Sequence, residues 1–217
     1  MNFEKKGYTV IKQAIDKKIA NFAYKYFLLK REVAKVLLDT KFISPYEKSW
    51  GHFNDTQVPD TYSHYADIAM ETLLQEIKPI MEKETNLKLI PTYSYARIYK
   101  KGDILRKHKD RFSCEISTTL NLGGDSWPIY VNPNPKKGII TKEKYIPSNS
   151  KGVKINLNPG DMLVYRGNIL EHWRETFKGE NCGQVFLHYN NAITPGSEKN
   201  KFDGRPILGL PINFQVE

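Results

Sequence analysis

The pattern of apolar positions divides the chain near residue 89 into a helical part and a β-rich part. From Asp16 to about residue 38, apolar side chains recur at the spacing of one face of an α-helix. Asp16 is a suitable N-cap for this helix. The apolar positions of the predicted helix are Ile19, Phe22, Ala23, Tyr26, Val33, Val36 and Leu37.

A second helix is predicted over residues 70–84, where an apolar stripe again follows helical spacing. Pro79 lies inside this stretch, which favours a kink or an early end of the helix. The stripe consists of Met70, Leu73, Leu74, Ile77 and Met81.

Residues 49–65 (SWGHFNDTQVPDTYSHY) separate the two helices and are polar, aromatic and punctuated by Gly and Pro. This composition predicts a long loop, with His52 and His64 at the surface. Because long loops in compact domains are often functional, residues 54–65 are a candidate lid over a binding site.

After residue 89 the chain consists of short runs that are rich in β-branched and aromatic residues and are separated by Gly, Pro, Asn and Asp. Many short strands at this density predict a β-sandwich, a jelly roll or a small barrel. The predicted strand segments read TYSYARIY, CEISTTLNL, PIYVN, VKINLNPGDMLVYRG, LEHWRETF and QVFLHYNNAI.

The composition changes this picture little. A chain of 217 residues with 40% hydrophobic and 12% aromatic residues can bury a substantial core. We expect no membrane span, and the first residues lack the apolar core of a secretory signal. The two cysteines are too few for a disulfide framework. These features predict a cytoplasmic, reduced protein.

The net charge of +9 raises the question of a nucleic-acid partner. The excess comes from lysine far more than from arginine, and arginine is the residue that binds phosphate as a planar fork. The lysines are also scattered among acidic residues. Nucleic-acid binding is therefore disfavoured, and the charge alone identifies no partner.

The candidate chemistry begins at His108 and Asp110, two positions apart in a predicted strand. The period of two places both side chains on one face, where they could occupy adjacent positions around a metal ion. His172, on a later predicted strand, is the candidate third ligand, whereas His188 sits in an apolar strand and is expected in the core or hydrogen-bonded beside the site. Two histidines and one carboxylate form a facial triad, which leaves positions on Fe(II) for an oxoacid and oxygen.

Four segments in this order resemble the prolyl-hydroxylase-like group of Fe(II)/2-oxoglutarate-dependent dioxygenases. They read YARIYKKGDILRKHKDR, CEISTTLNLGGDSWPIYV, NPGDMLVYRGNILEHWRE and QVFLHY, and they span about residues 90–190. The opening GYTVIKQAIDKKIANF is also similar to the helical lead-in of such enzymes.

The resemblance implies an α+β, mainly β fold: a double-stranded β-helix (jelly roll, cupin-like) with N-terminal helices packed on it. The chain would form a single dioxygenase domain, with a helical part and loop over 1–88 and the β-helix core over 89–217. His108, Asp110 and His172 would be the iron ligands. 2-Oxoglutarate would be the co-substrate, and ascorbate is an optional further cofactor.

The resemblance also implies hydroxylation of an unactivated C–H bond with release of succinate and CO2. The substrate would be a peptide, an amino acid or another small molecule, and the oligomeric state stays open. Two alternatives remain: a non-catalytic jelly-roll binding module and a nucleic-acid-directed oxidase.

The family carries a basic residue about ten positions after the second histidine, for the distal carboxylate of 2-oxoglutarate. Here that neighbourhood reads NCGQVF and holds no basic residue. Arg174 is the predicted replacement, because it lies two positions after His172 and should face the same interior. Lys178 and Arg97 are further candidates, and Arg174 could instead pair with Glu171 or Glu175.

Tyr99 and Thr119 are the predicted hydroxyl contacts of 2-oxoglutarate, with barrel packing for Tyr99 and an exposed strand position for Thr119 as the alternatives. Arg111 is expected either to hold Asp110 through a hydrogen bond or to bind an acidic substrate group. Arg97, on the same strand face as Tyr95 and Tyr99, is a second candidate for such a contact.

Overall fold

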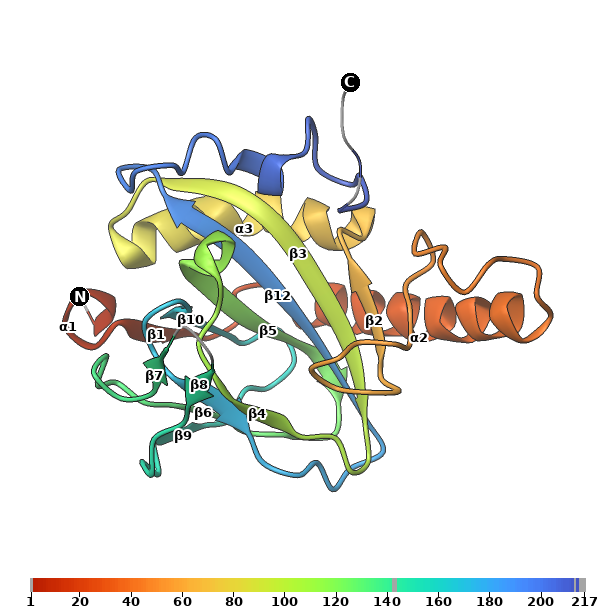
Figure 1. Ribbon diagram of the computed structural model, residues 1–217, viewed down its shortest axis with the longest axis horizontal. Helices are drawn as coiled ribbons and strands as arrows, with labels where there is room; N and C mark the ends of the chain where they lie inside the picture. The colour runs from red at the N-terminus through yellow and green to blue at the C-terminus, as the bar shows by residue number, and fades with distance from the viewer. Residues whose placement is uncertain (1, 142–143, 213, 215–217) are drawn as a thin grey trace.

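Two antiparallel sheets form the core of the computed structural model, which describes residues 2–141, 144–212 and 214 (Figure 1). The major sheet has six strands, in the order β1 (Tyr8–Ile11), β10 (Met162–Arg166), β5 (Ile116–Gly124), β12 (Asn181–Asn191), β3 (Leu89–Lys100) and β2 (Tyr62–Tyr65). The minor sheet has four strands, in the order β4 (Leu105–His108), β11 (His172–Arg174), β6 (Ile129–Val131) and β9 (Val153–Ile155). A separate hairpin joins β7 (Ile139–Ile140) to β8 (Tyr145–Ile146).

Two long helices, α2 (Lys17–Asp39) and α3 (Ile68–Thr85), pack on the major sheet. Each begins at an aspartate whose carboxylate accepts a backbone N–H: Asp16 from Lys18 at 2.7 Å and Asp67 from Met70 at 3.1 Å. Helix α3 continues through Pro79 to Thr85, so the early end predicted at this proline does not occur. The helix–sheet core includes Ala20, Ala23, Phe27, Met70, Leu74, Ile77, Met81, Ile98, Leu120 and Val185.

The face that α2 packs against the sheet coincides only in part with the predicted one. The buried positions are Ala20, Ala23, Phe27 and Ala34. Of the seven apolar positions singled out by their spacing, only Ala23 is buried; Ile19, Phe22 and Val36 are exposed and the other three are half-buried. The small alanine side chains let the helix approach the sheet closely. The spacing of apolar residues alone does not show which of two apolar faces will meet the sheet.

The N-terminal part of the chain contributes strands as well as helices. After α1 (Asn2–Lys6), the expected helical lead-in begins with β1, which pairs with β10. The predicted loop over 49–65 ends in β2, which pairs with β3. His64 on β2 is therefore buried rather than at the surface, and His52 is half-buried.

Two short 3-10 helices complete the fold, η1 (Phe112–Cys114) and η2 (Lys201–Gly204). The segment after η2 lies across α3 and β3 (Figure 1), where Arg205 forms a buried ion pair with Glu71 at 2.8 Å. In the described residues, no helix is both long and apolar enough to cross a membrane.

Candidate metal centre and co-substrate pocket

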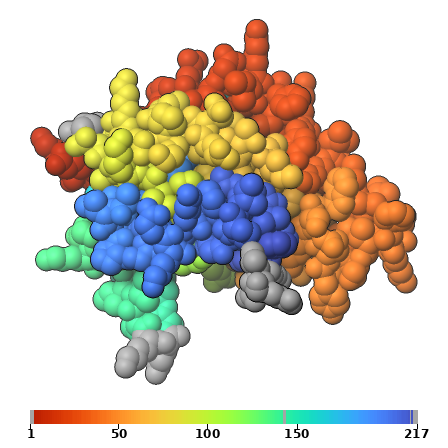
Figure 2. All heavy atoms as spheres, turned by 90° about the horizontal axis from the view of Figure 1, so that it is seen from above, coloured from red at the N-terminus to blue at the C-terminus, as the bar shows by residue number. Residues whose placement is uncertain are grey.

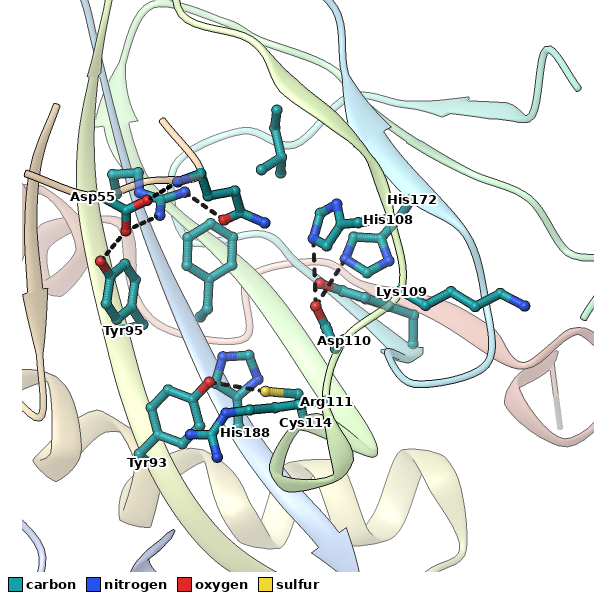
Figure 3. A pocket seen from close by; sticks show the side chains of 15 residues that line it. Asp55, Tyr93, Tyr95, His108, Lys109, Asp110, Arg111, Cys114, His172 and His188 are labelled. Carbon is teal, nitrogen blue, oxygen red and sulfur yellow. Dashed lines mark hydrogen bonds and ion pairs between the residues drawn. The ribbon is translucent and has the colours of Figure 1, made fainter. Parts of the chain in front are cut away.

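His108, Asp110 and His172 converge inside the barrel (Figure 3). His108 and His172 are cross-strand partners on β4 and β11, with ring centroids 4.2 Å apart. Asp110 follows β4, and its backbone N–H donates to the carbonyl of Gly167 at 2.9 Å. One oxygen of its carboxylate, Oδ1, lies 3.5 Å from Nε2 of His108 and 3.4 Å from Nε2 of His172. The three residues chosen from the sequence thus meet as one donor set.

Both imidazoles are oriented for metal binding through Nε2. Nδ1 of His108 lies 2.7 Å from the carbonyl of Arg106, and Nδ1 of His172 lies 2.9 Å from the carbonyl of Leu170. Since a carbonyl only accepts, each Nδ1 carries the proton and donates it, which leaves Nε2 free as a ligand atom. This donor set fits a divalent metal of the Fe(II) type.

The carboxylate of Asp110 is ionised, and a hydrogen bond to its second oxygen, Oδ2, holds it in place. Burial opposes ionisation, but the adjacent His172 and His108 outweigh it and hold the pKa of Asp110 well below its usual range. The hydroxyl of Ser117 donates to Oδ2 of Asp110 at 3.0 Å and lies 2.9 Å from Nδ1 of His188. Because the hydroxyl has one proton, His188 is the donor in the second bond. Burial lowers the pKa of His188 to about 4, so its ring is neutral near pH 7.

Gly167 lies directly against Asp110 and Ser117. A Cβ atom at this position would lie 2.3 Å from Oδ2 of Asp110 and 2.5 Å from Oγ of Ser117. A glycine is therefore required for space. Sequence reasoning missed Ser117 and Gly167, because only their three-dimensional proximity to Asp110 distinguishes them from strand and turn residues.

A cavity of about 340 Å³ opens beside the triad (Figure 3). Its lining is aromatic and basic as well as acidic. It consists of Asp55, Gln57, Tyr93, Tyr95, Arg97, Leu105, His108, Lys109, Asp110, Arg111, Cys114, Tyr165, His172, Phe186 and His188. This volume lies within the range of ligand-binding pockets.

Arg174 is fully buried, is not among the residues that line this cavity, and has an unusual set of partners. Its guanidinium donates to the backbone carbonyl of Trp127, to the hydroxyl of Thr119 at 3.1 Å and to Oε1 of Gln184 at 3.2 Å. Its Nε has no hydrogen-bond partner, and among the described residues no carboxylate pairs with it. Burial lowers the pKa of this guanidinium.

A buried cation without an anion is costly, because desolvation is not offset by an opposite charge. The alternative pairings of Arg174 with Glu171 and Glu175 do not occur. Glu171 accepts from the backbone of Ser148 at 2.7 Å instead, and Glu175 is exposed. The surroundings of Arg174 fit a ligand carboxylate that would supply the missing charge.

The predicted hydroxyl contacts lie around Arg174. Thr119 donates to Gln184 at 3.0 Å and is fully buried, so the exposed alternative for Thr119 is wrong. Tyr99 is also fully buried and packs edge-on against Trp127, 4.7 Å between ring centroids. Tyr165 lies against the triad, with its ring centroid 4.6 Å from that of His172.

Arg97 reaches the cavity from β3 but already has an anionic partner. Its guanidinium lies 2.6 Å from Oδ2 of Asp55, in the loop before β2, and it also donates to the hydroxyl of Tyr99 at 3.2 Å. The hydroxyl of Tyr95 donates to the same Asp55 carboxylate. Part of the candidate lid therefore lines the cavity through Asp55 and Gln57.

The remaining basic candidates serve other contacts. Arg111 forms a two-pronged pair with Asp203, at 2.9 and 2.6 Å, so it does not hold the Asp110 carboxylate as one prediction had it. Its guanidinium also lies 4.7 Å from the ring centroid of Tyr93. Lys178 is exposed on the surface.

The sequence matches no protein-family model and no curated protein. The fold, in contrast, is similar to solved structures. One is a prolyl-4-hydroxylase from Pseudomonas putida, with a TM-score of 0.56 and 13% identity over 88% of this chain and 95% of the other. A second is the epimerase SnoN from nogalamycin biosynthesis, with a TM-score of 0.60 and 12% identity over 88% of this chain and 81% of the other.

A third similar structure is HygX from Streptomyces hygroscopicus, at a TM-score of 0.56 and 13% identity over 88% of this chain and 85% of the other. The chain has the double-stranded β-helix fold. The predicted jelly roll with N-terminal helices packed on it is confirmed.

Proposed function

We propose that this chain is an Fe(II)- and 2-oxoglutarate-dependent oxygenase. It hydroxylates an unactivated C–H bond of an amino-acid residue or a small molecule and releases succinate and CO2. The observation that carries the proposal is the pairing of two features in one barrel: a His–Asp–His donor set and, beyond it, a buried arginine without an anionic partner among the described residues. The similar structure of HygX was solved with nickel and 2-oxoglutarate bound, and that of SnoN with Fe3+ and α-ketoglutarate.

In this proposal His108, Asp110 and His172 would hold Fe(II). The bound metal and oxoacid supply the oxygen activation, which protein side chains alone cannot perform. Arg174 and Thr119 hold the distal carboxylate of 2-oxoglutarate, an interaction that is strong because it is charge-assisted and dry.

The protein's own contribution is to orient ligands and to exclude water. Ser117 and His188 fix the carboxylate of Asp110 through hydrogen bonds, which is a common way of aligning a metal ligand. Leu105 and Phe186 form apolar walls of the cavity. The loop that carries Asp55 acts as the lid, held closed by the pairing of Asp55 with Arg97.

The cavity and the similar structures support this choice of substrate class. A prolyl hydroxylase from Trichoplax adhaerens, 10% identical with a TM-score of 0.56, was solved with a hypoxia-inducible-factor peptide, and HygX was solved with hygromycin B. A cavity of about 340 Å³ admits one amino-acid side chain or a comparable part of a small molecule. Lys109 at its wall favours a substrate with an acidic group nearby, whereas Arg111 is already paired with Asp203.

The test is succinate formation from 2-oxoglutarate under air with Fe(II), first without and then with candidate peptides and amino acids. Wild type should form succinate slowly alone and faster with a true substrate. Asp110→Ala and His172→Ala should abolish turnover, whereas His52→Ala, a histidine outside the donor set, should retain it. Ascorbate is added in a parallel series.

Two results would contradict the proposal. Binding of 2-oxoglutarate without succinate formation under any condition would favour a non-catalytic binding module. Succinate formation that is stimulated only by nucleic acid, with binding that weakens steeply as salt increases, would favour a nucleic-acid-directed oxidase.

A further inference from the structure

Helix α2 carries a second apolar face that its own domain does not cover. Phe22, Leu29 and Val36 recur at intervals of seven residues and are 72%, 66% and 60% exposed. Ile19 on the same side is 50% exposed. The buried face of α2 is formed mainly by alanines and Phe27, so these four exposed side chains are not needed for packing within one copy. Tyr26, between them, is half-buried, and its hydroxyl donates to Asp67 at 2.8 Å.

The second face has the spacing of a coiled-coil seam. Its apolar positions alternate at intervals of three and four residues, which is the a/d pattern by which two helices pack knobs into holes. We call this set the α2 seam; it consists of Ile19, Phe22, Tyr26, Leu29, Val33 and Val36. Six such positions in a helix of 23 residues, about 35 Å long, give three repeats of the pattern.

Surface hollows accompany the seam. One of about 520 Å³ is lined by Tyr26, Leu29, Lys30, Val33, Ser49 and Trp50. Another of about 270 Å³ is lined by Glu32, Val33, Val36 and Leu37. Hollows beside exposed knobs are what a second helix of the same pattern would fill, since its knobs enter holes on the facing helix.

The charges along one edge of the α2 seam indicate which kind of helix would pack against it. Lys18, Lys25, Glu32 and Asp39 follow each other at seven-residue intervals, and all four are exposed. Two positive charges thus lie in the first half of α2 and two negative charges in the second half. Such an edge is complementary to a copy of itself that runs in the opposite direction.

We propose that two copies of this chain form a two-fold dimer through antiparallel α2 seams. With Tyr26 opposite Leu29 of the partner subunit, the geometry of antiparallel heptads brings Lys25 to Glu32 of the partner subunit. The same register brings Lys18 to Asp39 of the partner subunit, and symmetry repeats both pairs. A parallel arrangement would instead place the two basic halves side by side, where they repel.

The rest of the molecule permits this arrangement. Figure 2 shows α2 along one edge of the molecule, and its C-terminal half extends past the sheets in Figure 1. Within the described part of one copy, the Glu32 side chain pairs only with Arg31, at 2.9 Å, and is 59% exposed. Exposed pairs of this kind contribute little, so Glu32 can turn to a partner. The proposal does not depend on the proposed activity.

The test is the molar mass of the full chain in solution, measured by light scattering and sedimentation over a range of concentrations. Wild type should have twice the mass of the 25.1 kDa chain. Leu29→Asp should be monomeric but folded, because Leu29 contributes an exposed side chain to the single copy. Lys35→Glu, a charge reversal on the exposed side of α2 away from the seam, should leave the mass unchanged.

Charge reversals then test the antiparallel direction. Lys25→Glu and Glu32→Lys should each weaken the dimer by roughly tenfold, since each replaces two attractions by two repulsions. The double variant should recover the wild-type dissociation constant to within about twofold. A wild type that stays monomeric at all concentrations would overturn the proposal, and the α2 seam would then be a candidate binding surface for a different protein. A dimer that survives Leu29→Asp, or a double variant without recovery, would overturn the proposed interface.

Discussion

Two buried arginines in this chain have opposite electrostatic surroundings, and replacing each by methionine should have opposite consequences. Arg205 pairs with Glu71 at 2.8 Å and both side chains are buried. Arg205→Met leaves the Glu71 carboxylate buried and uncompensated, which typically costs about 3–5 kcal/mol of unfolding free energy. In a domain of this size a loss of 1 kcal/mol lowers the melting temperature by roughly 2–4 °C.

Arg174 has no carboxylate partner among the described residues. Arg174→Met removes three hydrogen bonds to neutral acceptors, worth about 1 kcal/mol each. It also removes the desolvation penalty of a buried cation, which amounts to several kcal/mol. Thr119 and Gln184 keep their mutual hydrogen bond. We therefore expect the unfolding free energy of Arg174→Met to lie within about 1 kcal/mol of wild type, or above it.

For binding of 2-oxoglutarate we expect the opposite order: Arg174→Met should be impaired and Arg205→Met should not. Hydrogen bonds between a guanidinium and a carboxylate contribute about 1.5–3 kcal/mol each, so loss of two such bonds should weaken 2-oxoglutarate binding by a hundredfold or more. With Mn(II) in place of iron to prevent turnover, 2-oxoglutarate at a hundred times its Kd should stabilise wild type and Arg205→Met by about 2.7 kcal/mol. At the same concentration it should barely stabilise Arg174→Met.

Urea denaturation of the three proteins, with and without 2-oxoglutarate, measures both effects. The reasoning is refuted if Arg174→Met loses as much unfolding free energy as Arg205→Met in the absence of ligand, because Arg174 would then be a structural residue. It is equally refuted if Arg174→Met retains the wild-type affinity for 2-oxoglutarate.

The remaining predictions concern Asp110 and acid stability. Gly167→Ala should reduce metal affinity by roughly a hundredfold, because its Cβ would displace the Asp110 carboxylate. Ser117→Ala, which loses one hydrogen bond to Asp110, should reduce metal affinity by about tenfold. Titration with Mn(II) measures both affinities, and an unchanged affinity of Gly167→Ala would contradict the site geometry. Burial opposes ionisation of Asp67, but hydrogen bonds from His64 and Lys30 outweigh it and lower its pKa. Its stabilising contribution is therefore complete above the unfolded-state pKa of about 3.9 and is lost as the pH falls below that value. Asp67→Asn keeps the helix cap and should flatten the decline in unfolding free energy below pH 4; an unchanged decline would contradict this assignment.

The sequence brings His108, Asp110 and His172 together as candidates, and the structure shows that their side chains converge. The strand predicted here, β4, ends at His108, and Asp110 follows it, but the two-residue spacing still keeps both side chains beside the same site. A facial triad then needs only one more histidine on a strand. The jelly roll is likewise predictable, because its strands are short, β-branched and punctuated. Arg174 was predicted from the same period, yet its lack of an anionic partner could only be seen once the strands were assembled.

The errors arise where local patterns have two structural solutions. The spacing along α2 fits both a packing face and the exposed seam, and only the close approach of the alanines decides which side meets the sheet. The segment YSHY, residues 62–65, is too short and polar to predict as a strand, and it becomes one because β3 offers an edge to pair with. Pro79 is tolerated inside α3, where tertiary packing outweighs the lost hydrogen bond.

Anaerobic titration of the protein with Fe(II) and 2-oxoglutarate tests the central claim most directly, because chelation of iron by the oxoacid gives a visible metal-to-ligand absorption band. We expect wild type to develop this band, His172→Ala to lack it, and Arg174→Met to require at least a hundredfold more 2-oxoglutarate. Wild type that binds Fe(II) but develops no band at any 2-oxoglutarate concentration would contradict the assignment of the site.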